Sequence, residues 1–127
     1  MNKNILTDTP DDRGEIVVYQ PDELTRLEVR VGDETVWVNR NQMSLLFERD
    51  VKTIGKHINN ALCEELSDMA VVANFATTAS DGKVYSVAYY NLDMVLSVGY
   101  RVKSSKGVQF RRWANSILKE YMIKGYT

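Results

Sequence analysis

Residues 41–62 of this chain read Asn-Gln-Met-Ser-Leu-Leu-Phe-Glu-Arg-Asp-Val-Lys-Thr-Ile-Gly-Lys-His-Ile-Asn-Asn-Ala-Leu. The pattern predicts two short helices joined by a polar turn at positions 48–50, which is typical of a helix-turn-helix. The first helix would bury Met43, Leu46 and Phe47. The second helix repeats apolar residues at positions 51, 54, 58 and 62, a spacing that puts one apolar stripe on one helical face.

Polar side chains mark both the start and the outer face of the second helix. Asp50 is a favoured N-cap, because its carboxylate can accept a hydrogen bond from the first free backbone amides. Side chains on the outer face are of the kinds that contact phosphates and base edges. The candidate DNA-binding residues of this segment are Arg49, Lys52, Thr53, Lys56 and Asn59.

The turn departs from the usual helix-turn-helix pattern, which often has a glycine there. Glu48 and Arg49 occupy the turn instead, and a left-handed conformation at a residue other than glycine costs about 1 kcal/mol. Glu48 also places a negative charge near any bound phosphate backbone. A pair of packed core helices with a solvated polar face remains the alternative interpretation of this segment.

Composition indicates one domain. The chain has 127 residues, of which 44% are hydrophobic, enough to bury one core. Neither a membrane-spanning run nor an apolar signal segment is present, so we expect no membrane association and a cytoplasmic protein. Cys63 is the single cysteine, which excludes an intrachain disulfide, and we expect it to be a small, at least partly buried side chain.

Charge is distributed unevenly along the chain. The net formal charge is −1, but residues 101–127 carry seven Lys or Arg against one acidic residue. Such a basic end is expected of a module that meets an anion with one face, although Lys and Arg also commonly solvate the outer face of a terminal helix.

Two β-hairpins are predicted around the helical pair. Residues 1–14 are polar and are expected to form a flexible tail. A strand at 15–20 is followed by alternating residues at 27–31, a turn at Gly32-Asp33 and a returning strand at 35–38, where Trp37 would anchor the core.

The second hairpin, at residues 71–78 and 83–90, turns at Asp81-Gly82. A hairpin that follows a recognition helix corresponds to the wing of a winged helix-turn-helix. Lys83 at its tip is then a further DNA-binding candidate, and an ordinary hairpin that covers the helices is the alternative.

Two helices follow the second hairpin. Asn91 would cap a helix over 92–99 that Gly99 ends. The last helix is amphipathic and long, with Phe110, Trp113, Ala114, Ile117, Leu118 and Tyr121 on one face. Arg111 and Arg112 lie off that apolar stripe and complete the set of candidate DNA-binding residues. The expected fold is therefore an α+β, winged helix-turn-helix-like single domain over residues 15–127.

Several sequence strings carry a family resemblance. The segments at 14–20, 34–38, 77–82 and 90–93, followed by Ser-Val-Gly-Tyr-Arg-Val at 97–102 and Gln-Phe-Arg-Arg-Trp-Ala at 109–114, resemble the N-terminal region of the RhuM family of bacterial virulence-associated proteins. The Phe-Arg-Arg-Trp pattern is similar, more distantly, to the Bro-N type DNA-binding modules of phage antirepressors.

The resemblance implies a DNA-binding protein, with a role in transcription of mobile or virulence-associated genes. Family members are usually much longer, so the resemblance also implies the N-terminal part of a longer architecture, or a naturally short member. A C-terminal effector region would then be a partner of this segment.

Catalysis is not expected from these residues. His57 and Cys63 fall on largely opposite faces of one helix, and the glycines are scattered singly, so neither a nucleophilic dyad nor a phosphate-binding loop is predicted. We expect no enzyme, no cofactor and no metal. Two functions from different classes follow: a module that binds double-stranded DNA, in which a homodimer would double the contacts, or a protein–protein interaction module that uses the same fold without DNA.

Overall fold

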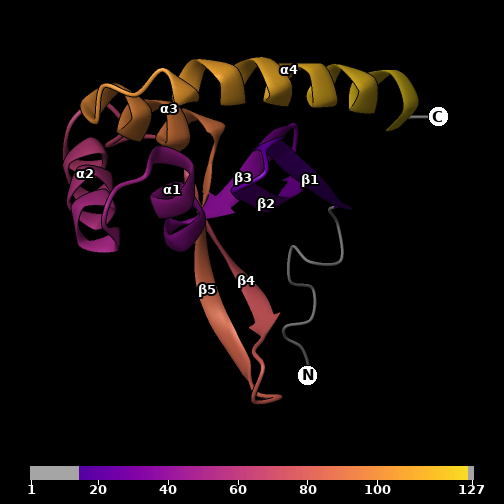
Figure 1. Cartoon of the computed structure of the whole chain (residues 1–127), viewed down its shortest axis with the longest axis horizontal. Helices are drawn as coiled ribbons and strands as arrows, with labels where there is room; N and C mark the ends of the chain where they lie inside the picture. The colour runs from indigo at the N-terminus through magenta and orange to yellow at the C-terminus, as the bar shows by residue number, and fades with distance from the viewer. Residues whose placement is uncertain (1–14, 126–127) are drawn as a thin grey trace.

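The computed structural model describes the backbone of residues 15–125 and the side chains of residues 15–121. These residues form a single α+β domain with one antiparallel sheet of five strands and four helices (Figure 1). The predicted flexible tail at 1–14 and the final residues 126–127 lie outside the described residues.

The first three strands form a meander. They are β1 (Glu15–Asp22), β2 (Thr25–Gly32) and β3 (Thr35–Asn39). In β2, residues Leu27, Val29 and Val31 are buried while their neighbours face outward, as the period of two predicted. The turn lies at Asp33-Glu34, one residue later than predicted, and both residues have positive φ angles of 54° and 64°. This backbone is typical of a two-residue hairpin turn whose twist matches the strands.

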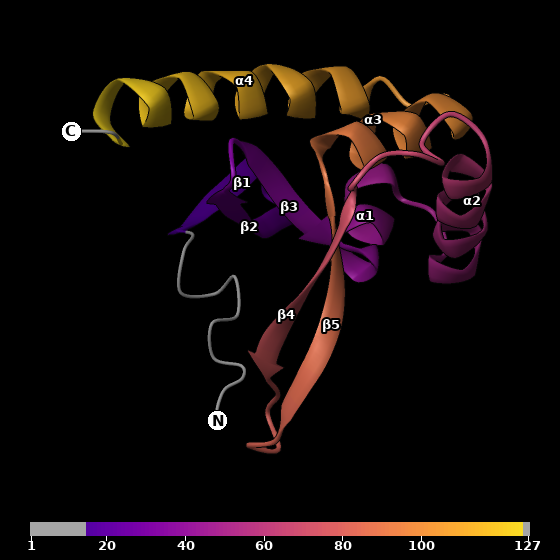
Figure 2. The same ribbon diagram turned by 180° about the vertical axis from the view of Figure 1, so that it is seen from behind.

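The second hairpin, β4 (Val72–Thr78) and β5 (Val84–Asn91), joins the same sheet. The strand order is β1-β2-β3-β5-β4, and β5 pairs with β3 through only the residues Tyr89, Tyr90 and Asn91. The rest of the hairpin therefore projects beyond the body of the domain, as Figures 1 and 2 show from both sides. The two predicted hairpins are thus parts of one continuous sheet.

The helical pair lies at the predicted positions, with the turn at 48–50. Helix α1 (Arg40–Phe47) buries Met43, Leu46 and Phe47, and α2 (Val51–Cys63) buries Ile54 and Ile58. The Asp50 side chain accepts a hydrogen bond from the Lys52 amide, so the predicted N-cap is confirmed. Cys63, which was expected to be at least partly buried, is exposed at the end of α2.

Helices α3 (Leu92–Arg101) and α4 (Lys106–Gly125) close the fold. Asn91 caps α3 as predicted, but α3 continues to Arg101 and does not end at Gly99. A Cβ atom at position 99 would lie 3.1 Å from Phe47 Cζ and 3.6 Å from Gly107 Cα. Gly99 is therefore a close-packing position between helices, and its small size is used inside the helix rather than at its end.

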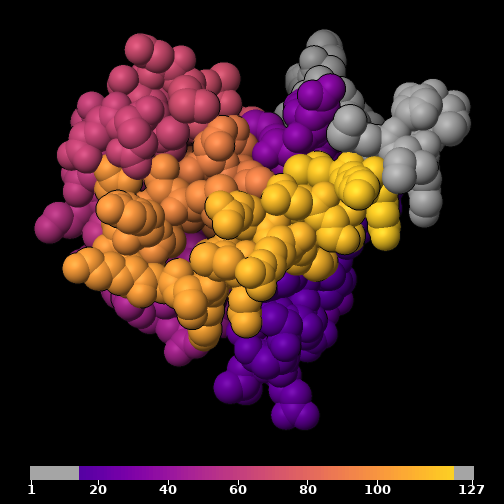
Figure 3. All heavy atoms as spheres, turned by 90° about the horizontal axis from the view of Figure 1, so that it is seen from above, coloured from indigo at the N-terminus to yellow at the C-terminus, as the bar shows by residue number. Residues whose placement is uncertain are grey.

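The core lies between the helices and the β1–β3 face. Seen from above, α4 crosses the first strands (Figure 3), where Tyr19 packs edge-on against Phe110 at a centroid distance of 5.2 Å. Trp37 is buried as predicted, but it belongs to a second, smaller cluster with Phe75 and Tyr89 at the base of the projecting hairpin. The Arg30 guanidinium covers this cluster, 4.8 Å from the Phe75 ring centroid.

Candidate nucleic-acid interface

Helix α2 presents a basic polar face to solvent. Lys52, Lys56 and Asn59 are exposed, and Thr53 is half-buried. These exposed residues are three to four positions apart, so they lie in one row on the helix. The segment Val51–Cys63 contains neither Asp nor Glu, and only the Asp50 cap brings a carboxylate to its N-terminus. Four of the predicted DNA-binding residues are therefore together on one helix.

Arg40, at the start of α1, extends this face. Its side chain lies against α2 at Gly55, where a Cβ atom would be only 3.2 Å from Arg40 Nη1. Gly55 is three positions after Lys52 and four before Asn59, so it lies beside these two residues on the helix surface. We call Arg40, Lys52 and Lys56, together with Asn59, the basic row. Sequence reasoning missed Arg40, although a glycine inside a helix signals that another group approaches closely.

A groove separates the helical pair from the projecting hairpin. Its volume is about 230 Å³, and it brings the start of both helices beside β5. The residues that line it are Asn39, Arg40, Asn41, Val51, Val87, Ala88 and Tyr90. Arg40 belongs both to this groove and to the basic row, so the two form a continuous surface between α2 and the hairpin.

Lys83 lies at the tip of the hairpin, as predicted, and is exposed. The Asp81 carboxylate accepts hydrogen bonds from the Lys83 amide and from the Tyr85 hydroxyl, both at 2.9 Å. These bonds lower the pKa of Asp81 and keep it ionised. Lys83 is five positions before Ala88 of the groove, about 17 Å at 3.4 Å per residue of extended strand. Lys83 is therefore at the far end of the surface that begins at α2.

The turn between α1 and α2 uses its charged residues within the fold. Arg49 donates hydrogen bonds to the carbonyl oxygens of Phe47, at 3.1 Å, and Val102, at 3.0 Å. Its guanidinium thus joins the turn to the end of α3, a role that competes with the predicted DNA contact. Glu48 forms an ion pair with Lys106 of α4. Lys106 therefore compensates the negative charge of Glu48, which would otherwise repel a bound phosphate.

Glu48 adopts the left-handed conformation that is costly without glycine, with φ of 55° and ψ of 49°. We expect Glu48→Gly to be more stable than Glu48→Ala by about 1 kcal/mol, because both variants lose the ion pair but only glycine relieves the backbone strain. Urea unfolding followed by circular dichroism measures the difference. Equal midpoints for the two variants would show that the turn carries no such strain.

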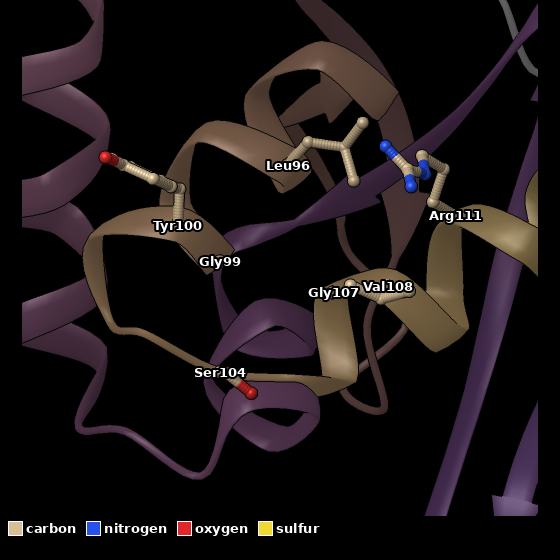
Figure 4. A pocket seen from close by; sticks show the side chains of 7 residues that line it. All are labelled: Leu96, Gly99, Tyr100, Ser104, Gly107, Val108 and Arg111. Carbon is tan, nitrogen blue, oxygen red and sulfur yellow. The ribbon is translucent and has the colours of Figure 1, made fainter.

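Arg111 and Arg112 are exposed on α4. In Figure 1, α4 lies along the top of the molecule and the hairpin tip lies at the bottom. Arg111 lines a separate hollow of about 160 Å³ between α3 and α4, where its side chain extends toward Leu96 (Figure 4). The structure therefore divides the predicted residues into a group on α2 and the hairpin and a second group on α4.

Part of the basic C-terminal charge is used in ion pairs. Arg101 donates hydrogen bonds to Glu64 at 2.8 Å and Glu65 at 2.7 Å, in the segment that follows α2. Hydrogen bonds from Arg101 lower the pKa of Glu65 to about 2. With Lys106 bound to Glu48, two of the basic residues in this segment stabilise the fold around α2. The positive charges of residues 101–127 therefore do not form a single binding face.

A larger cavity, of about 570 Å³, lies on another part of the domain and is lined by Asp33, Glu34 and Asp93. These carboxylates would repel phosphate, so this surface is unsuited to nucleic acid. None of the helices within residues 15–125 has both the length and the apolar character required to cross a membrane.

Comparison with known proteins identifies a family for the C-terminal part of the chain. Residues 70–127 match the model of the Virulence protein RhuM family. The match covers the β4–β5 hairpin, α3 and α4, and it confirms the resemblance to this family. The searches of curated proteins and of solved structures gave no match. The more distant resemblance to Bro-N type modules stays a prediction.

Proposed function

We propose that this chain, whose residues 70–127 match the model of the RhuM family, binds double-stranded DNA as a winged helix-turn-helix module. In this proposal α1 and α2 are the helix-turn-helix, α2 enters the major groove, and the β4–β5 hairpin is the wing. The charged members of the basic row contact the phosphates that border the groove, and Thr53 and Asn59 face the base edges.

The observation that carries the proposal is the arrangement of the basic row. Arg40, from a different helix, lies against α2 at Gly55, beside the face that carries Lys52 and Asn59. Three positive charges on and beside this helix, with Glu48 turned into an ion pair with Lys106, form a surface that attracts a phosphate backbone. Lys83 supplies a further contact from the hairpin tip.

The proposed role follows from the kind of contact. A module that reads a short DNA segment through one helix suits regulation of transcription, and the family name associates the chain with virulence. Because each copy offers only a few phosphate contacts, we expect binding to random DNA with a dissociation constant of about 1–100 µM at low salt.

The test is fluorescence anisotropy of a labelled duplex over a series of salt concentrations. Contacts from Arg40, Lys52, Lys56 and Lys83 predict that log Kobs falls with log salt with a slope of about −3 to −4. In Lys52→Ala/Lys56→Ala the slope should become shallower by about 2, because each lysine neutralises about one phosphate.

Two outcomes would contradict the proposal. If the unmodified chain shows no salt-dependent binding at low ionic strength, the same fold is a protein–protein interaction module. If the double variant keeps the slope of the unmodified chain, DNA binds to another surface. Circular dichroism of the variant must match that of the unmodified chain, since both substitutions are at exposed positions.

A further inference from the structure

The projecting hairpin has an open edge. Strand β4 is at the end of the strand order, and β5 is its partner on one side. Beyond Tyr89, β5 has no second neighbour among the described residues, so the distal hairpin is a ribbon of two strands. Such a ribbon is only marginally stable in water by itself. Val84, 65% exposed, and Val72, 42% exposed, add apolar surface to it.

The hydrogen bonds define which backbone groups of β4 face outward. The Asn91 amide donates to the Val71 carbonyl, and the Ala79 amide donates to the Lys83 carbonyl. Alternate residues of an antiparallel strand bond to the same neighbour, so residues 71, 73, 75, 77 and 79 point their backbone groups toward β5. The residues whose N–H and C=O groups point to the open edge are Val72, Asn74, Ala76 and Thr78.

The two edges of the sheet differ in how they are protected. The opposite edge strand, β1, has a register shift between Tyr19 and Asp22, contains Pro21, and carries acidic residues at both ends. Prolines, irregularities and charges are features that prevent edge-to-edge pairing. Strand β4, with the sequence Val-Ala-Asn-Phe-Ala-Thr-Thr, has none of them. Its edge is therefore suited to receive another strand.

We propose that β4 pairs antiparallel with β4 of a second copy of this chain, about a twofold axis at Phe75. In this register Asn74 lies opposite Ala76 of the copy, and Val72 lies opposite Thr78. Every outward-facing residue then finds a backbone partner, which no other register about a twofold axis achieves. The two sheets become one continuous sheet.

The side chains of β4 fit a copy of the same strand. The strand carries no charge, so identical strands do not repel each other. Phe75 is its only large side chain and lies on the axis, while Ala73 meets Thr77 of the copy on the same face. Asp81 and Lys83 lie beyond the strand, and antiparallel pairing places those of the two copies at opposite ends of the interface. A second copy is therefore the occupant that this edge favours.

Sedimentation equilibrium of the full chain tests the pairing. Since a single strand edge is a small interface, we expect a dimer with a dissociation constant of about 1–100 µM. Ala76→Pro removes an outward N–H and should leave a monomer. Ser86→Pro is the matched control: Ser86 is paired with Ala76 on the same hairpin, but its N–H points to the other edge, so this variant should remain a dimer.

Disulfide formation tests the register. In a Cys63→Ser background, a mixture of Ala73→Cys and Thr77→Cys chains should form a mixed disulfide on oxidation, because these positions face each other across the axis. Each variant alone should form none, since identical positions would lie about 13 Å apart, beyond disulfide reach.

The proposal is overturned by any of three results: a monomer at about 0.1 mM chain, a dimeric Ala76→Pro together with a monomeric Ser86→Pro, or no mixed disulfide. These measurements use no DNA. Their outcome is therefore independent of the proposed DNA contact.

Discussion

Phe110→Ala should lower the free energy of unfolding by about 3–5 kcal/mol. Phe110 is completely buried and packs against Tyr19 of β1 and Trp113 of α4, with centroid distances of 5.2 and 5.6 Å. Removing its ring leaves a cavity between α4 and the sheet that neither rigid element can fill. Since small domains are stable by about 5–15 kcal/mol, this loss is a large part of the total. Urea unfolding at neutral pH measures it.

Val108→Ala is the matched control for the same helix. Val108 is exposed, so its truncation should change the free energy of unfolding by less than about 0.5 kcal/mol. If Phe110→Ala does not fold, Phe110→Leu provides a milder change, with an expected loss of about 1 kcal/mol. Equal midpoints for the Val108 and Phe110 variants would mean that α4 does not pack on the sheet as described.

Reversing the charge of the basic row should abolish measurable DNA binding. Lys52→Glu/Lys56→Glu removes two phosphate contacts and adds two repulsive charges, for which we expect affinity to fall about 100-fold. Both side chains are exposed and α2 keeps its buried stripe, so the fold should be preserved. Anisotropy with the labelled duplex at about 0.1 M salt is the measurement, because charges more than about 10 Å from the DNA are then screened.

Arg111→Glu/Arg112→Glu changes the net charge by the same amount on α4. Because α4 lies on a different side of the molecule from the hairpin tip, this variant should bind DNA nearly as well as the unmodified chain (Figure 1). A greater loss for the α4 variant than for the α2 variant would place the DNA against α4. Comparing the two variants therefore shows whether the basic residues of α2 or those of α4 contact the DNA.

Local features of the chain were predictable because they depend on neighbours in sequence. The apolar spacing around Ile54 and Ile58, and the caps at Asp50 and Asn91, located α2 and the start of α3. The polar turn at 48–50 was located in the same way, but the sequence did not decide that Glu48 would be left-handed. The α+β class and the RhuM resemblance were also readable from the chain alone.

Other features depend on contacts between distant segments. The spacing of Gly99 is equally suited to a helix end and to a close approach, and the approach of Phe47 decides between them. The same holds for Gly55, whose partner Arg40 is 15 positions away in the sequence. A sequence period reports which face of an element is buried, but it does not report which element covers that face.

The helices, the strands and their buried faces could be located from the amino-acid sequence, since they follow from backbone geometry and the burial of apolar side chains. The pairing of β3 with β5, which joins the two hairpins into one sheet with an open edge at β4, is a tertiary contact that the sequence did not reveal. Tertiary contacts also place Arg40 against α2 at Gly55, whereas Arg111 and Arg112 are on α4. The physical reason is that strand pairing and charge clustering bring together groups that are far apart along the chain, and no local pattern specifies those partners.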